Sequence, residues 1–269
     1  MNTSASSTAR ARDPWRVVRY LYRVPLLLLH VIVAVVLAIS VFTWARQTVD
    51  KGREPLAHRL IRWWSRVLLR IFGFRVYRYG EPLPDPAMFV CNHSSWLDIE
   101  LMHTQRAVCF VAKAEIARWP LVGWLASTGG TIFHRRGNNH SLSVVMKEMT
   151  RRLNIGRSVA VFPEGGTNDG RTLKVFHARI FQAALDADAQ VQPAALRFMR
   201  NGVRCYDAGF LPDESFMGNF LRLLGDPPLD VEVHFLKPVP RFEAGRKRMA
   251  ETARQAIADA LDGVGEGDR

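Results

Sequence analysis

The longest stretch of the chain without a charged side chain runs from Val24 to Ala45 and predicts a helix that enters a membrane. Its 22 residues are mostly apolar, and a helix of that length can cross the hydrocarbon core of a bilayer or enter it deeply. A signal peptide is the alternative, but no small-x-small cleavage site precedes the polar Arg46 and Gln47.

The next apolar pattern, in residues 53–74, predicts a basic amphipathic helix at a membrane surface. Apolar side chains recur at helical spacing, and arginines mark another face. The apolar positions are Leu56, Leu60, Trp63, Trp64, Val67, Leu68 and Ile71, and the basic positions are Arg59, Arg62, Arg66 and Arg70. A helix packed on the protein core, with its arginines in solvent, is the alternative. Residues 15–74 are therefore expected to form a membrane-anchoring helix pair, after a disordered tail at 1–14.

From residue 75 to 262, short apolar runs alternate with stretches of helical periodicity. We expect strands at Met88–Cys91, Val108–Ala112, Thr131–His134, Ser158–Phe162, Gln192–Phe198 and Asp230–Leu236. We expect helices at Trp96–Thr104, Pro120–Ser127, Ser141–Ile155, Val175–Ala187 and Ala244–Leu261. This alternation predicts an α/β domain with a central mixed sheet flanked by helices, and residues 263–269 form a frayed tail.

The positive charge of the chain is concentrated near its N-terminus. The formal net charge is +12, and residues 1–72 contain twelve basic and three acidic side chains. Basic clusters beside apolar helices favour anionic lipid headgroups. A nucleic-acid partner is not expected, because no recognition motif or stacking platform is visible. The 3 cysteines are too few and scattered for a disulfide framework or a zinc site, which indicates a reduced, cytoplasm-facing domain.

Asn92, His93 and Asp98 follow the first strand of the domain and are the first candidates for chemistry. A histidine at a strand exit lies where ligands bind in α/β sheets. A carboxylate in contact with an imidazole can hold its tautomer and let it act as a general base. Since five helical residues rotate a side chain by about 140°, we expect His93 in the turn and Asp98 reaching back to it. The alternative is a loop histidine followed by a first-turn helix acid.

The string VFPEGGTNDG, residues 161–170, runs from a buried strand into a glycine-rich turn. Pro163 ends the strand, and Gly165 and Gly166 allow the backbone to approach a ligand closely. Glu164 could orient a substrate hydroxyl or a basic side chain, and Lys174 would add to a phosphate-binding surface. A tight connection from strand to helix is the alternative.

Two further strings complete the set. GTIFHRR, residues 130–136, ends its strand with Arg135 and Arg136, and two guanidiniums there suit a phosphate because arginine binds it bidentately. Charges in solvent before a turn are the alternative. VQPAAL, residues 191–196, is an apolar strand interrupted by Pro193. Pro193 is interpreted as a structural residue, and a role in shaping the site wall is the alternative.

In this order, the four motifs resemble those of the glycerolipid acyltransferase family, which makes phosphatidic acid from lysophosphatidic acid. The residues that match are Asn92, His93 and Asp98; Gly130, Phe133 and Arg136; Phe162, Pro163, Glu164 and Gly165; and Pro193. Gly166 replaces the usual threonine, and Thr167 is displaced by one position, so the hydrogen bond expected from that hydroxyl is in question. Residues 110–124 also resemble acyltransferases that complete ornithine lipids.

The resemblance implies transfer of an acyl group from acyl-CoA or acyl-carrier protein to the free hydroxyl of a lysophospholipid, first 1-acylglycerol 3-phosphate. A lyso-ornithine lipid or another lysolipid is the alternative acceptor, and a basic membrane-binding protein is the non-enzymatic alternative. His93 would remove the hydroxyl proton, and Asp98 would hold the imidazole.

The resemblance also implies where substrates and membrane lie. The expected substrate-binding residues are Asn92, Gly130, Phe133, Arg135, Arg136, Glu164, Gly165, Thr167, Lys174 and Pro193. No metal and no cofactor beyond the thioester co-substrate are implied. We expect the protein at the inner membrane, in contact with membrane lipids, with the acyltransferase domain at 75–262 facing the cytoplasm.

Overall fold

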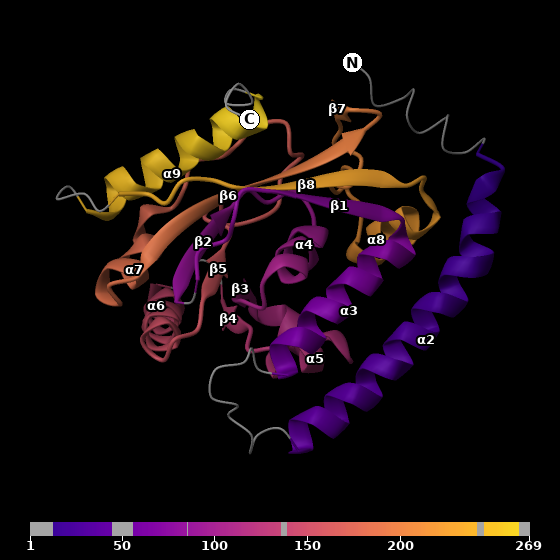
Figure 1. Cartoon of the computed structure of the whole chain (residues 1–269), viewed down its shortest axis with the longest axis horizontal. Coiled ribbons are helices and arrows are strands. Elements are labelled where there is room, and N and C mark those ends of the chain that lie inside the picture. The colour runs from indigo at the N-terminus through magenta and orange to yellow at the C-terminus, as the bar shows by residue number, and fades with distance from the viewer. Residues whose placement is uncertain (1–12, 45–55, 85, 136–138, 241–244, 264–269) are drawn as a thin grey trace.

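The computed structural model describes residues 13–44, 56–84, 86–135, 139–240 and 245–263 (Figure 1). The expected tails at 1–14 and 263–269 fall almost wholly outside these ranges, as does Arg136. The described chain forms a central sheet with helices on both faces, so the predicted α/β class with a mixed sheet is confirmed.

The sheet has the strand order β1-β8-β6-β2-β5-β3-β4, with β7 paired to β6. The strands are β1 (Phe74–Tyr79), β2 (Ala87–Cys91), β3 (Cys109–Lys113), β4 (Ile132–His134), β5 (Val159–Val161), β6 (Gln190–Arg200), β7 (Val203–Arg204) and β8 (Leu229–Phe235). The strands β6, β2, β5, β3 and β4 are mutually parallel, whereas β8 runs antiparallel to β6 and pairs with β1 in parallel. The parallel strands therefore end at one common edge of the sheet, where the first three motifs follow them.

Two hydrophobic cores lie on opposite faces of the sheet. One packs helices α3, α4 and α8 against it, and the other packs α6, α7 and α9. The helices and 3₁₀ turns are α2 (Trp15–Trp44), α3 (Leu56–Phe72), α4 (Leu97–Gln105), η2 (Ala114–Arg118), α5 (Val122–Thr128), α6 (Asn139–Asn154), η3 (Ala178–Phe181), α7 (Gln182–Asp186), α8 (Phe216–Gly225) and α9 (Arg246–Leu261). Side chains alternate along β8, where Val231 and Val233 are fully buried, because successive residues face opposite sides of a sheet.

Four elements were not predicted, and one prediction was wrong in part. They are the edge strand β1, the short strand β7, the 3₁₀ turn η2 and the helix α8. The helix expected at Val175–Ala187 begins only at η3, because the preceding residues form part of the loop that packs around the third motif.

Helix α2 packs alongside α3 and α8 and is the outermost helix in Figure 1. Its inner face carries the buried Arg23, His30, Ala34 and Ala38. Its outer face is apolar and exposed, from Trp15 through Leu21, Leu28, Leu29, Ile32 and Val36 to Ile39. By length and composition alone α2 could cross a membrane, as no other described helix could.

Helix α3 has an apolar face and a basic face, as the sequence predicts. Trp63, however, lies on the basic face and not on the apolar one. Leu68, Leu69 and Phe72 are buried against the sheet. Trp63 is 38% exposed and lies at helical spacing from the exposed Arg66 and Arg70, so one side of α3 is both aromatic and basic.

Candidate active site

The first and third motifs meet because β2 and β5 are parallel neighbours. Val90 lies beside Val161 in the register, so the chain leaves both strands at the same edge of the sheet. His93 follows β2 by two residues, and Glu164 follows β5 by three. In α/β sheets the carboxyl edge of the strands is where ligands bind.

The expected contact between His93 and Asp98 is present. Nδ1 of His93 lies 2.9 Å from Oδ2 of Asp98, whose side chain is fully buried. Because a carboxylate only accepts hydrogen bonds, this contact requires the proton on Nδ1 and leaves the lone pair on Nε2. Within the described residues no protein group bonds to Nε2, and the His93 side chain keeps 11% of its surface exposed. An imidazole in this state can accept a proton at Nε2.

Asp98 also closes the turn that holds His93. The backbone N–H groups of Ser94 and Ser95 each donate to Oδ2 of Asp98 at 2.8 Å. The carboxylate therefore holds the turn that leads into α4, while the Ser95 hydroxyl accepts a longer bond, 3.3 Å, from the Leu97 N–H. The position of the histidine and the start of the helix depend on the same oxygen.

The plane of the His93 ring is fixed by an aromatic stack. Phe162 lies parallel to it, with ring centroids 3.8 Å apart and planes 10° apart. Phe110 stacks on the other side of Phe162 at 5.4 Å. Phe162 belongs to the third motif, and sequence analysis assigns it no role beyond the match to the family pattern.

Glu164 braces the loops around the histidine. One oxygen accepts the backbone N–H of His93 at 2.8 Å, and the other accepts the N–H of Lys174 at 2.9 Å and the side-chain amide of Asn168. The Asn168 N–H in turn donates to the His93 carbonyl at 3.1 Å. Burial raises the pKa of Glu164, although these N–H donors favour its charged form. Both oxygens are thus occupied within the protein, which indicates that Glu164 positions the loops; Asn168 was not singled out from the sequence.

The glycine-rich turn passes close to another side chain. Gly165 has φ of +76°, and a Cβ there would lie 3.0 Å from Nε2 of His177, so only glycine fits without strain. Thr167 and Lys174 are exposed at the surface of this turn, where the Lys174 ammonium lies 3.4 Å from the Thr167 carbonyl. Both side chains can reach a ligand that approaches the carboxyl edge of the sheet.

Asn92 and Pro193 lie beneath the turn. The Asn92 amide donates to the Leu196 carbonyl at 3.0 Å and accepts from the Leu196 N–H at 2.8 Å. Pro193 is buried in β6, paired in register with Val90. Asn92 therefore ties the exit of β2 to β6, and the structure places Pro193 in the floor below it.

The second motif lies farther along the same edge, on β4, with β5 and β3 between it and β2. Gly130 has φ of +87°, and a Cβ there would lie 3.4 Å from Sγ of Cys109. Phe133 is the middle residue of β4, and Arg135 is exposed just after it, its N–H bonded to the Ser141 hydroxyl. Arg135 is therefore separated from His93 along this edge by the strands β5 and β3.

Comparison with known proteins agrees with this arrangement. The acyltransferase family profile matches residues 75–197. A lyso-ornithine lipid O-acyltransferase from Pseudomonas aeruginosa is 38% identical over 78% of this chain and 81% of its own length. A 1-acyl-sn-glycerol-3-phosphate acyltransferase from Neisseria gonorrhoeae is 30% identical over 71% of this chain and 76% of its own.

The chain belongs to the acyltransferase family. Its fold is also that of the crystallised 1-acyl-sn-glycerophosphate acyltransferase from Thermotoga maritima, with a TM-score of 0.65 and 17% identity, over 92% of this chain and 99% of that one. The predicted family and enzyme class are confirmed, and the His93–Asp98 pair lies inside the region that the family profile covers.

Proposed function

We propose that this acyltransferase moves an acyl group from an acyl thioester to the free hydroxyl of a lysolipid. The observation that carries the proposal is the His93 ring, bonded to Asp98 at Nδ1 and open at Nε2. Curated relatives that acylate lysolipids support the acceptor class.

The reaction follows from this geometry. The acceptor hydroxyl gives its proton to Nε2 of His93 as its oxygen attacks the thioester carbonyl. The C–S bond then breaks, and the proton passes from the imidazolium to the leaving thiolate. Asp98 stabilises the imidazolium through Nδ1–H, which keeps the ring in the same orientation throughout. The substrate supplies the nucleophile, so no covalent enzyme intermediate is needed.

Two acceptors are proposed, in a definite order. A lyso-ornithine lipid comes first, because the 38% identical relative is named for that activity. The acceptor 1-acylglycerol 3-phosphate comes second, supported by the 30% identical relative. For a phosphate-bearing acceptor, Lys174 and Arg135 would supply positive charge at the carboxyl edge of the sheet, and Arg136, outside the described residues, stays a candidate from the sequence alone.

The proposal is tested by incubating the purified protein with each acceptor and with acyl-CoA or acyl-carrier-protein thioesters. The masses of the products are then measured by mass spectrometry. We expect a mass gain of one acyl chain on a lysolipid and release of an equal amount of thiol. His93→Ala is the matched control for background hydrolysis. Thiol release without an acylated lysolipid, or equal yield from His93→Ala, contradicts the proposal.

We further propose that α2 lies along one leaflet of the inner membrane, with the catalytic domain on the cytoplasmic side. The support is that the inner face of α2 is held by the domain along its length. Arg23 donates to the Leu224 and Asp226 carbonyls, and His30 stacks on Trp64. A helix held in this way leaves only its apolar outer face for the hydrocarbon region.

Labelling tests this placement. A cysteine introduced at Gln47 in sealed vesicles, with the catalytic domain outside, should react with a membrane-impermeant reagent added outside. Reaction only from inside the vesicle would show that the helix crosses the bilayer. The wild-type protein, with Cys91 and Cys109 buried, gives the background labelling.

A further inference from the structure

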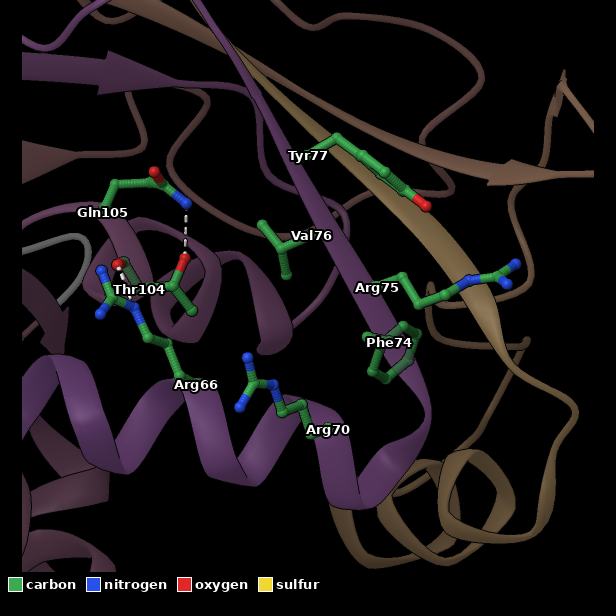
Figure 2. A pocket seen from close by; sticks show the side chains of 8 residues that line it. All are labelled: Arg66, Arg70, Phe74, Arg75, Val76, Tyr77, Thr104 and Gln105. Atoms are coloured by element: carbon green, nitrogen blue, oxygen red, sulfur yellow. Dashed lines mark hydrogen bonds between the residues drawn. The ribbon is translucent and has the colours of Figure 1, made fainter.

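A pocket of about 390 Å³ lies between α3 and the strand that follows it, away from the catalytic edge of the sheet. The chain turns sharply at Gly73, so the last two turns of α3 and the strand β1 form two walls. The end of α4 closes the third side with Thr104 and Gln105 (Figure 2). β1 is an edge strand, paired only with β8 in the described sheet, so its other edge borders this space.

Two guanidiniums from one helix point into this space. Figure 2 shows Arg66 extending from α3 toward Thr104 at the end of α4, and Arg70 extending into the space between α3 and β1. Nε of Arg66 donates to the Thr104 carbonyl at 3.1 Å, which fixes that side chain at the rim of the pocket. The Arg70 side chain has no hydrogen bond or ion pair in the part of the chain that the structure describes. The third arginine of the lining, Arg75, extends away from α3 and is paired with Asp230 at 2.5 Å.

The charges of the pocket are not balanced from within. None of its eight lining residues is acidic. Arg66 and Arg70 are four residues apart on one helix face, where like charges destabilise a helix. Arg70 lies in the last turn of α3 and so favours the helix dipole, but Arg66, one turn earlier, is aimed at the same space. Two guanidiniums lining a half-open pocket suit an oxyanion, because each forms charge-assisted hydrogen bonds.

The same side of α3 carries exposed apolar side chains. Leu56 is 50% exposed, and Trp63, between Arg59 and Arg66 along the helix, is an aromatic residue of the kind that lies at lipid headgroup level. The pocket therefore opens beside a helix face suited to the membrane surface.

We propose that this pocket binds the phosphate of an anionic glycerophospholipid headgroup, as a site separate from the acyl-transfer centre. Arg66 and Arg70 would hold the phosphate oxygens, and the polar Gln105 would face the rest of the headgroup. The proposal rests on the placement of α2 along one leaflet given under the proposed function, because α3 packs beside α2. A free phosphate shares the same chemistry, and the experiment separates the two sources.

Binding is measured on the full-length protein in a neutral detergent, by thermal unfolding at increasing ligand concentration. The probes are short-chain phosphatidylglycerol, short-chain phosphatidylcholine and inorganic phosphate. The variants are Arg70→Gln, Arg66→Gln and the matched control Arg59→Gln, which removes one charge from the same helix face outside the pocket. Neither acyl transfer nor a membrane is needed, so a failure here is distinct from a failure of the proposed function.

We expect phosphatidylglycerol to stabilise the wild type and Arg59→Gln equally and saturably. Arg70→Gln should bind about tenfold more weakly, as expected for the loss of one charge-assisted donor group. Arg70→Gln is the decisive variant, because its side chain holds nothing else in place, whereas Arg66→Gln also loses the bond to Thr104. Equal binding by Arg70→Gln and wild type, or an equal loss in Arg59→Gln, overturns the proposal. Saturation by inorganic phosphate at the same concentration overturns the lipid source and assigns a free phosphate to the pocket.

Discussion

Among the described histidines that stack face to face on an aromatic ring, His93 lies at the carboxyl edge of the sheet and His30 lies between α2 and α3. The rings of His93 and Phe162 are 3.8 Å apart with planes 10° apart, and those of His30 and Trp64 are 4.2 Å apart with planes 18° apart. The stacking is nearly the same, and the hydrogen bonds differ. His93 meets a buried carboxylate at Nδ1, whereas Nε2 of His30 lies 3.1 Å from the Trp64 carbonyl.

The difference shows what the site of His93 has that the site of His30 lacks. A stack fixes the plane of the ring in either region. In His30 the Nε2 atom is hydrogen-bonded to a carbonyl, whereas in His93 the Nε2 atom is open. The role of His30 is therefore to pack α2 against α3. Of these two contacts, the Asp98 carboxylate fixes the tautomer and also stabilises the charged ring that proton transfer produces, which a carbonyl does less well.

The strongest test of this comparison removes each ring in turn. His93→Ala should lower kcat for acyl transfer about a hundredfold or more, because the proton acceptor is lost, while far-UV circular dichroism stays unchanged. His30→Ala is the matched control: it removes the same ring from the other stack and should leave the rate in detergent within about threefold of wild type. Comparable losses in the two variants would show that the stacks matter for packing alone.

The second test keeps the shape of the carboxylate and removes its charge. Asp98→Asn should lower kcat roughly tenfold to a hundredfold, because an amide no longer stabilises the imidazolium. Oδ1 of Asp98 has no partner in the described chain, so an amide nitrogen fits there and the bonds to Ser94 and Ser95 survive. Steady-state rates at several pH values, with thermal unfolding to check the fold, measure the effect. A rate near wild type would remove the charge of Asp98 from the mechanism.

The third test concerns the brace between the two loops. Glu164→Gln places an N–H₂ group against backbone or side-chain N–H donors of His93, Lys174 or Asn168, which leaves donors facing donors. We expect a stability loss of about 1–3 kcal/mol in chemical denaturation and a fall in kcat of about tenfold. If the rate fell with no change in stability, Glu164 would act on the substrate instead of on the loops.

The fourth test moves to the α2 side of the comparison. Arg23 is 1% exposed, and its Nη1 donates to the Leu224 and Asp226 carbonyls, each at 2.9 Å. Arg23→Gln should cost about 1.5–3 kcal/mol of the free energy of unfolding, because charged donors to the end of α8 are lost. We expect kcat in detergent to remain near wild type. A hundredfold loss of kcat would contradict the separation of the two regions.

The smallest effect is expected for Glu214, which lies just before α8 and forms hydrogen bonds with Asn219 and Arg222 of that helix. Burial opposes its ionisation, but hydrogen bonds from Arg222, Leu211 and Asn219 outweigh it and hold the pKa at about 2, below the ordinary value of 4.5. An acid with a lowered folded pKa stabilises the fold above 4.5 and loses this effect as pH falls toward 2.

Glu214→Gln should therefore be less stable than wild type at neutral pH, by about 1 kcal/mol after solvent screening. The gap should narrow as the pH falls from 4.5 to 2, as measured by urea unfolding across that range. A gap that is constant with pH would show that the charge of Glu214 does not carry the effect.

Much of the site was predictable from local strings. The short distance between His93 and Asp98 in sequence and the strand before them predicted a turn and a contact, and both are present. The bracing by Asn168 and the stack on Phe162 could not be predicted, because they depend on β2 and β5 lying side by side. The periodicity of apolar residues within each strand does not indicate which strand it pairs with.

The fold was predictable to a similar degree. Buried parallel strands such as β2 appear as continuous apolar runs, and long helices such as α9 have a clear period. β1 was missed because only its first residue, Phe74, is buried, and α8 because its short sequence contains Gly218 and Asn219, which have low helix propensity. Substrate-binding roles for Thr167, Lys174, Arg135 and Arg136 stay predictions.

The central claim is that Nε2 of His93 is the free base, held so by Asp98 at Nδ1. Selective ¹⁵N-histidine labelling and NMR in detergent test it directly, with the His93 signals assigned by their loss in His93→Gln. The account predicts, in the neutral ring, a proton on Nδ1 and none on Nε2, and loss of this preference in Asp98→Asn. A proton found on Nε2 of the neutral ring in the wild type would contradict it.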